Sequence, residues 1–127
     1  MADDLYDQGM AIRRKVLGDA YVDRAMEGVD DFNRDFQRMV TEYCWGNLWG
    51  REALSHKQRS LNNLCLLAAL NRSQDLEAHV RGAIRNGCTV DEIRETLMQV
   101  AVYAGVPAGV EAFRVARRAL DAEGIQS

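Results

Sequence analysis

The chain has 127 residues, a length that fits one domain able to bury about two-thirds of the surface that its unfolded form would expose. The formal net charge is −3 and charges of both signs are interleaved, so no basic patch predicts nucleic acid or an anionic membrane as a partner. The three cysteines form no Cys-x-x-Cys pair and no zinc-like spacing, which is typical of reduced thiols in a cytosolic protein without a metal. The N-terminus lacks a secretory signal, and no apolar run reaches the roughly 18 residues of a membrane span. We therefore expect a single cytoplasmic domain over residues 1–127.

Every segment with clear hydrophobic periodicity has the helical period, and three helices are expected in the first part of the chain. The first runs from about residue 4 to residue 17, and a short helix follows around residues 22–26. Asp30 or Asp31 can cap the third helix. The third helix carries an apolar stripe of Phe32, Phe36, Met39, Val40 and Tyr43. Gly46 and Gly50, each directly preceded by a tryptophan, then break the apolar pattern.

Four helices are expected in the second part of the chain. The first can start at Ser55, and its residues 64–70 are apolar on all sides, which predicts a place in the centre of a bundle. The second spans residues 73–87, and a capping box at Thr89 begins the third. The last helix is expected to bury Val110, Phe113, Ala116 and Leu120. Because the segment around residues 22–26 is only a short turn of helix, the fold class is an all-α bundle of about six helices with short connections.

His79 lies inside the apolar stripe of the predicted helix 73–87, next to Val80 and one turn after Leu76. A histidine that faces a core needs partners for both ring nitrogens, so it is either satisfied structurally or used in function. Asp75, one turn earlier, could accept a hydrogen bond from the imidazole and fix its tautomer. From the residue types alone, the structural role is the more frequent of the two.

Five other residues are candidates for a site, and each has an ordinary alternative. Arg59 could hold a carboxylate through its guanidinium, or be a solvated arginine in the first turns of its helix. Glu42 could move protons, or be an exposed helix carboxylate. Trp45 and Trp49 could wall a pocket, or pack in a core or subunit interface. Tyr103 could donate its hydroxyl into a cavity, or serve bundle packing with a wet tip.

Several segments together carry a resemblance that no single residue carries. They are residues 13–18 (RRKVLG), 41–46 (TEYCWG), 59–61 (RSL), 67–72 (LAALNR), 79–83 (HVRGA) and 102–108 (VYAGVPA). With these segments the chain resembles the carboxymuconolactone decarboxylase family from about residue 9 to residue 120. The resemblance implies one carboxymuconolactone decarboxylase-like domain with the all-α fold of alkylhydroperoxidase D. It also implies a homo-oligomer, expected to be a hexamer.

The activity implied by the resemblance is cofactor-free decarboxylation of 4-carboxymuconolactone to 3-oxoadipate enol-lactone in aromatic catabolism. The substrate is a small lactone carboxylate that accepts the electron pair itself, so neither a metal nor an organic cofactor is expected. On this interpretation Arg59 binds the retained carboxylate, and His79 donates a proton or stabilises the oxyanion. Glu42 relays protons and Tyr103 donates a hydrogen bond. Apolar walls are expected from Trp45 and Trp49.

The sequence supports three alternatives to this activity to different degrees. Thiol peroxidase chemistry is disfavoured, because Arg72 and Asp75 stand where the peroxidase branch of the fold has its Cys-x-x-Cys. A paralogue acting on a related lactone or keto acid fits Val110, since relatives commonly have Asn at this position. A non-catalytic helical assembly protein would need only the apolar core pattern.

Overall fold

The computed structural model describes residues 2–126, with side chains from residue 4 onward, and all regular secondary structure in this part of the chain is helical. The all-α prediction is therefore confirmed, and the described residues form seven α-helices and one π-helix where about six helices were expected. None of the described helices is long and apolar enough to cross a membrane. The chain divides into two compact units, residues 1–55 and residues 56–127. The expectation of a single domain over residues 1–127 stays a prediction.

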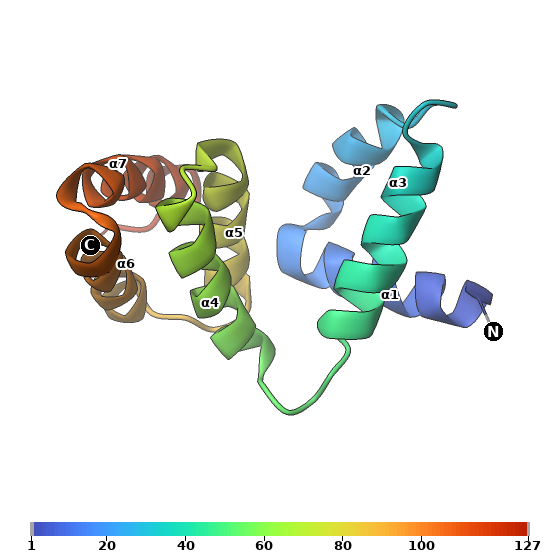
Figure 1. Ribbon diagram of the computed structural model, residues 1–127, viewed down its shortest axis with the longest axis horizontal. Coiled ribbons are helices and arrows are strands. Elements are labelled where there is room, and N and C mark those ends of the chain that lie inside the picture. The colour runs from blue at the N-terminus through green and yellow to red at the C-terminus, as the bar shows by residue number, and fades with distance from the viewer. Residues whose placement is uncertain (1, 127) are drawn as a thin grey trace. The chain divides into compact units, whose positions relative to one another are not determined.

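The first unit contains three α-helices and the π-helix (Figure 1). They are α1 (Ala2–Leu17), α2 (Asp19–Glu27), α3 (Arg34–Met39) and η1 (Val40–Leu48). The helix of α3 continues into η1, where the hydrogen bonds reach five residues back, as from the N–H of Trp49 to the carbonyl oxygen of Cys44 at 3.0 Å. The helix was expected to break at Gly46, but η1 runs through this residue to Leu48.

Gly46 is needed because α1 and η1 pack backbone against backbone. A β-carbon at Gly46 would lie 2.8 Å from both the carbonyl oxygen and a side-chain methyl of Leu5 on α1. On the opposite helix, a β-carbon at Gly9 would collide with the carbonyl oxygen of Thr41. Each helix thus carries a glycine at the point of closest approach, so the glycine in η1 marks a contact and not a helix end. Around this contact the unit buries Val16, Leu17, Val22, Trp45 and Trp49.

A buried arginine also connects α1 to α3 and η1. Arg13 is 6 % exposed, and its Nη1 donates hydrogen bonds to Oε1 of Gln37 at 3.2 Å and to Oγ1 of Thr41 at 3.3 Å. Burial lowers the pKa of the Arg13 guanidinium from its ordinary value, because the charged form loses solvation. The contacts place a polar link inside the apolar packing of the unit.

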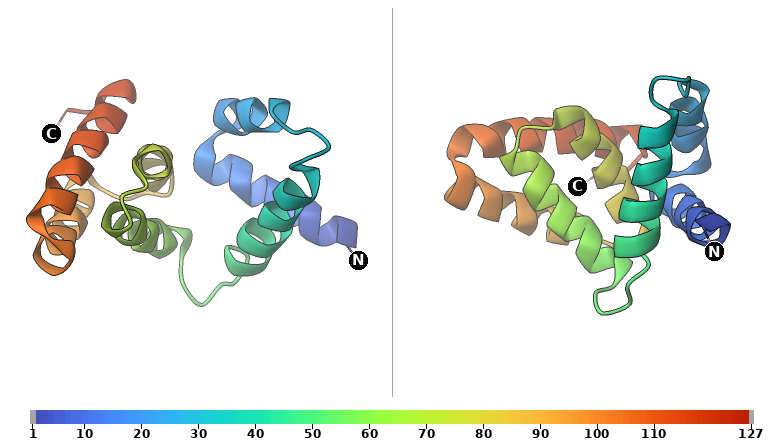
Figure 2. Two further views of the ribbon diagram at one scale, coloured as in Figure 1. Left: turned by 45° about the horizontal axis from the view of Figure 1, so that its top comes forward. Right: turned by 45° about the vertical axis from the view of Figure 1, so that its right-hand side comes forward.

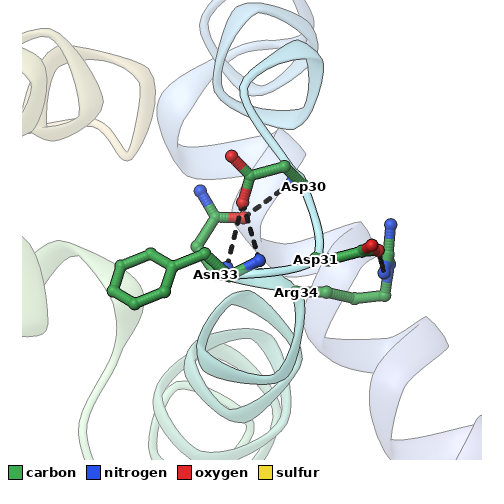
Figure 3. A network of polar contacts seen from close by, with 5 residues as sticks. Asp30, Asp31, Asn33 and Arg34 are labelled. Carbon is green, nitrogen blue, oxygen red and sulfur yellow. Dashed lines mark hydrogen bonds and ion pairs between the residues drawn. The ribbon is translucent and has the colours of Figure 1, made fainter.

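The turn before α3 is held by side chains (Figure 3). Oδ1 of Asp30 accepts hydrogen bonds from the N–H groups of Phe32 and Asn33, and Oδ1 of Asn33 accepts one from the N–H of Asp30 at 2.9 Å. Asp31 forms an ion pair with Arg34 at 2.6 Å. The expectation that Asp30 or Asp31 caps this helix is wrong, because the N-cap of α3 is Asn33 and Asp30 instead holds the preceding turn.

The second unit consists of four helices around one apolar core (Figures 1 and 2). They are α4 (His56–Ala69), α5 (Ser73–Arg85), α6 (Val90–Ala104) and α7 (Val106–Ala122). The capping box is confirmed, since Thr89 accepts from the N–H of Glu92 while the Glu92 side chain accepts from the N–H of Thr89. Gly105 joins α6 to α7 at φ 111°, a conformation that favours glycine. The centre of the core is made by Leu64, Leu76, Val80, Ala83, Ile93, Leu97 and Val115.

Three sequence expectations about burial are wrong. The stripe at the start of the third helix is exposed, the segment 64–70 is covered on one side only, and α7 turns part of its expected core face to the surface. In α7 the buried positions are instead Gly109, Ala112, Val115, Ala116, Ala119 and Leu120. Periodicity identified the apolar faces but not which of them another helix covers. The large apolar residues left exposed at these places are Phe32, Phe36, Met39, Tyr43, Leu66, Leu70, Val110 and Phe113.

Candidate functional site

His79 projects from the middle of α5 toward α4, where the two helices pack. Its Nδ1 lies 3.5 Å from the amide Nδ2 of Asn63 on α4. The ring is largely withdrawn from water, and this desolvation lowers the pKa of His79 from 6.5 to about 4, with the nearby charge of Asp75 opposing the shift. The polar contact to Nδ1 therefore comes from α4, and Asp75 acts on the ring through its charge.

The low pKa of His79 decides which chemistry the ring can perform. With a pKa of about 4, roughly one His79 in a thousand carries the second proton at pH 7. A neutral imidazole has one ring nitrogen that donates and one that accepts. His79 can therefore donate a hydrogen bond to a developing negative charge or accept a proton. At neutral pH, however, very few His79 rings are in the charged imidazolium form that acts as an acid.

Arg59 lies on α4, the helix that the His79 ring faces. It lies one helical turn before Asn63 on α4, and residues four apart on a helix project from the same face. A hydrogen bond of 2.9 Å from Nδ2 of Asn86 to Oγ of Ser60 joins the same two helices. Arg59 is half-buried, and the Nε atom of its guanidinium is shielded from solvent. The packed helices α4 and α5 thus carry a fixed positive charge and a neutral imidazole, respectively.

Glu42 belongs to the first unit, on η1. It forms an ion pair of 2.7 Å with Nε of Arg38, one turn earlier. Both residues line a surface pocket of about 400 Å³ in this unit, within the range of small-molecule sites. The other lining residues are Leu5, Asp35, Met39, Tyr43 and Asn47.

Trp45 and Trp49 are core residues of the first unit. They are 4 % and 1 % exposed, and their ring centroids lie 5.0 Å apart at an interplanar angle of 32°. Of the two roles expected from the sequence, pocket walls and packing, the two tryptophans therefore have the packing role. A second pocket of about 430 Å³ lies along η1 and is lined by Tyr43, Cys44, Asn47, Leu48 and Arg51.

Tyr103 lies near the end of α6 with 86 % of its surface exposed. Val110 is also exposed, on the second turn of α7. Neither residue lines the pockets described above. Among the residues with described side chains, no group of three or more His, Cys, Asp or Glu could hold a metal ion.

In the second unit Arg59 lies one turn before Asn63, the residue that contacts His79, while Glu42, Trp45 and Trp49 share η1 in the first. Sequence reasoning missed Asn63. Its position four residues after Arg59, on a helix otherwise rich in leucine, was the available signal. A polar side chain at such a position needs a hydrogen-bond partner, and His79 provides one.

The all-α fold places the guanidinium of Arg59 on α4 and the neutral imidazole of His79 on the facing helix α5. The family comparison gives the class of protein. Residues 34–118 match the model of the carboxymuconolactone decarboxylase family, and the chain belongs to that family.

The relatives are named as decarboxylases, and their names give two different substrates. The chain is 38 % identical over 120 residues to a 4-carboxymuconolactone decarboxylase of Acinetobacter baylyi, covering 94 % of this chain and 90 % of the relative. It is 41 % identical over 117 residues to a nitrosuccinic acid decarboxylase of Metarhizium robertsii, covering 92 % and 82 %. A further 4-carboxymuconolactone decarboxylase, from Pseudomonas putida, is 55 % identical over 42 residues, which cover 33 % of this chain and 88 % of that sequence.

Proposed function

We propose that this protein is a carboxy-lyase that converts 4-carboxymuconolactone to 3-oxoadipate enol-lactone in the cytoplasm, without a cofactor, during aromatic catabolism. The observation that carries the proposal is the similarity to a 4-carboxymuconolactone decarboxylase over 94 % of the chain, supported by the contact of Asn63, one turn after Arg59, with His79. In the reaction, the bond to the departing carboxylate breaks and its electron pair moves through the ring double bond to the lactone carbonyl. The resulting dienolate then takes up a proton at the carbon beside that carbonyl.

The protein has to stabilise two negative charges in this reaction. We assign the retained carboxylate to Arg59, because a guanidinium offers paired N–H donors in the geometry of a carboxylate. We assign the developing oxyanion to His79, since its low pKa makes it a hydrogen-bond donor rather than a ready acid at pH 7. Glu42 remains the proposed proton relay, and Tyr103 a proposed hydrogen-bond donor. For Trp45 and Trp49 we propose that they support the η1 surface from within.

A second candidate substrate is nitrosuccinic acid. The similarity to a nitrosuccinic acid decarboxylase covers 92 % of the chain, with 41 % identity over 117 residues. The chemistry is parallel, because a carboxylate beside a nitro group leaves its electron pair on that group, as the lactone does on its carbonyl. The same cation and the same neutral donor would serve either substrate.

We also propose that the protein acts as a homo-oligomer, with the hexamer as the expected form. Exposed apolar side chains support this proposal: on α6 and α7 they include Met98, Val102, Val106 and Phe113. Size-exclusion chromatography with light scattering, carried out at several protein concentrations, tests this proposal. A monomer at every concentration would contradict it.

The test of the activity uses the purified protein with each substrate and no added cofactor. Carbon dioxide release and loss of substrate are followed for 4-carboxymuconolactone and for nitrosuccinic acid in parallel. We expect turnover of the lactone, and a fall in kcat of about a hundredfold or more in His79→Ala. Turnover of nitrosuccinic acid alone would favour the second candidate. Turnover of neither, or a His79→Ala variant as active as the parent, would contradict the assignment.

A further inference from the structure

Asn63 is the residue beside His79 to which no role has been assigned. It lies on α4, half-buried, with its amide Nδ2 at 3.5 Å from Nδ1 of His79. An amide nitrogen only donates hydrogen bonds, so the ring nitrogen that faces it has to accept. In a neutral imidazole, an accepting Nδ1 requires that the proton sits on Nε2.

We propose that Asn63 is a positioning residue that holds His79 in the tautomer with its proton on Nε2. This inference rests on the proposed decarboxylation, because it specifies which atom of His79 meets the substrate. The neutral Nε2–H donates a hydrogen bond to the lactone oxygen as negative charge develops there. No proton has to leave the ring, so His79 is unchanged at the end of each turnover.

The burial of the ring makes this arrangement possible. Since desolvation holds the pKa of His79 near 4, both neutral tautomers compete at neutral pH and the charged ring does not interfere. A neighbour that donates to one nitrogen then selects between the two tautomers. The distance of 3.5 Å is long for a hydrogen bond, and such contacts in sites without substrate often shorten when the substrate is bound.

The position of Asn63 on α4 adds a geometric argument. Arg59 lies one turn earlier on the same face, so the residue that would bind the carboxylate and the residue that orients the imidazole share one rigid helix. The contact from Asn86 to Ser60 fixes α4 against α5 at the neighbouring turn. The helix pair thus sets the orientation of the His79 ring relative to Arg59 before any substrate arrives.

The first experiment reads the tautomer directly. Protein labelled with ¹⁵N in its histidines is studied by NMR at pH 7 without substrate, and the signals of His79 are assigned with the His79→Gln variant. We expect Nδ1 to give the shift of an unprotonated ring nitrogen and Nε2 that of a protonated one. A protonated Nδ1 would overturn the proposal, whatever the enzyme's activity.

The second experiment inverts the contact. In Asn63→Asp the amide donor becomes a carboxylate, which only accepts, so Nδ1 is expected to become protonated and the His79 pKa to rise. We expect kcat to fall by about tenfold to a hundredfold while KM changes less. An inverted tautomer with unchanged kcat would overturn the proposal, as would an unchanged tautomer.

Asn62→Asp is the matched control, because it makes the same chemical change at the adjacent residue. Asn62 is exposed, accepts a hydrogen bond from Gln58, and projects about 100° away around the helix. We expect the tautomer of His79 to stay unchanged and kcat to stay within about twofold, because an exposed charge is screened. An equal loss of kcat in both variants would show a general effect of charge and overturn the proposal. If neither substrate is turned over while the Nε2–H tautomer is found, the proposed function fails and the role of Asn63 in setting the tautomer stands.

Discussion

The burial of His79 predicts that the protein loses stability in mild acid. The unfolded chain exposes this histidine with a pKa of about 6.5, whereas the folded protein lowers that pKa to about 4. Between these two values the unfolded state binds more protons than the folded state, so the free energy of unfolding falls as the pH falls. The contribution is fully present above pH 6.5 and is lost as the pH approaches 4.

The size of the effect follows from the two pKa values. At pH 5 the unfolded state gains about 2 kcal/mol from protonation of this histidine relative to the folded state, and the full loss near pH 4 is about 3 kcal/mol. A typical domain is stable by roughly 5 to 15 kcal/mol, so the loss is a large part of the total. The charge of Asp75, one turn earlier on the same helix, opposes the shift but does not cancel it.

Urea unfolding followed by circular dichroism at pH 7 and pH 5 measures this effect in the parent protein and in His79→Gln. The variant keeps a polar side chain of similar reach but cannot titrate, and all other groups contribute equally to both proteins. We expect the parent to lose about 2 kcal/mol more than the variant between the two pH values, at one protein concentration. Equal losses in the two proteins would refute the reasoning, because His79 would then titrate alike in the folded and unfolded states.

Three further predictions concern the capping box, the contact of α1 with η1, and the proposed carboxylate site. Thr89→Ala removes the acceptor for the N–H of Glu92 and should lower the free energy of unfolding by about 1 kcal/mol, measured with urea. Gly46→Ala forces a β-carbon against α1 and should cost roughly 1 to 3 kcal/mol, seen as earlier unfolding by tryptophan fluorescence. Gly28→Ala is its control, since a β-carbon there would make only an ordinary contact at 3.5 Å, and equal effects would contradict the packing argument. Arg59→Lys keeps the charge but loses the paired donors, so KM for the lactone should rise by about tenfold; an unchanged KM would count against Arg59 as the carboxylate site.

Local signals in the sequence were the most reliable guide to the fold. The capping box at Thr89 and the core stripe through Leu76 and Val80 were predicted correctly, because both depend on residues within one or two helical turns. The exposure of Phe36 was not predictable in this way. An apolar face shows that a surface avoids water, but what covers it depends on residues far away in the sequence.

The same limit applies to the helix around Gly46 and to the candidate site. Glycine lowers helix propensity, so Gly46 indicated a break, but its role is to admit Leu5 from a helix forty residues earlier. His79 was identified as unusual from its own helix alone. Its partner Asn63 and its low pKa come from the packing of α4 on α5, which periodicity does not specify.

The π-helix η1 has a consequence for how the protein tolerates changes in chain length. Deleting one residue from an ordinary α-helix rotates everything after the deletion by about 100° and so misplaces an entire face. In η1 the hydrogen bonds already span one residue more than in an α-helix. A single deletion within residues 40–48 could therefore be absorbed by a return to α-helical bonding, with both ends of the segment kept in register. We expect relatives of different length to differ here by a one-residue gap.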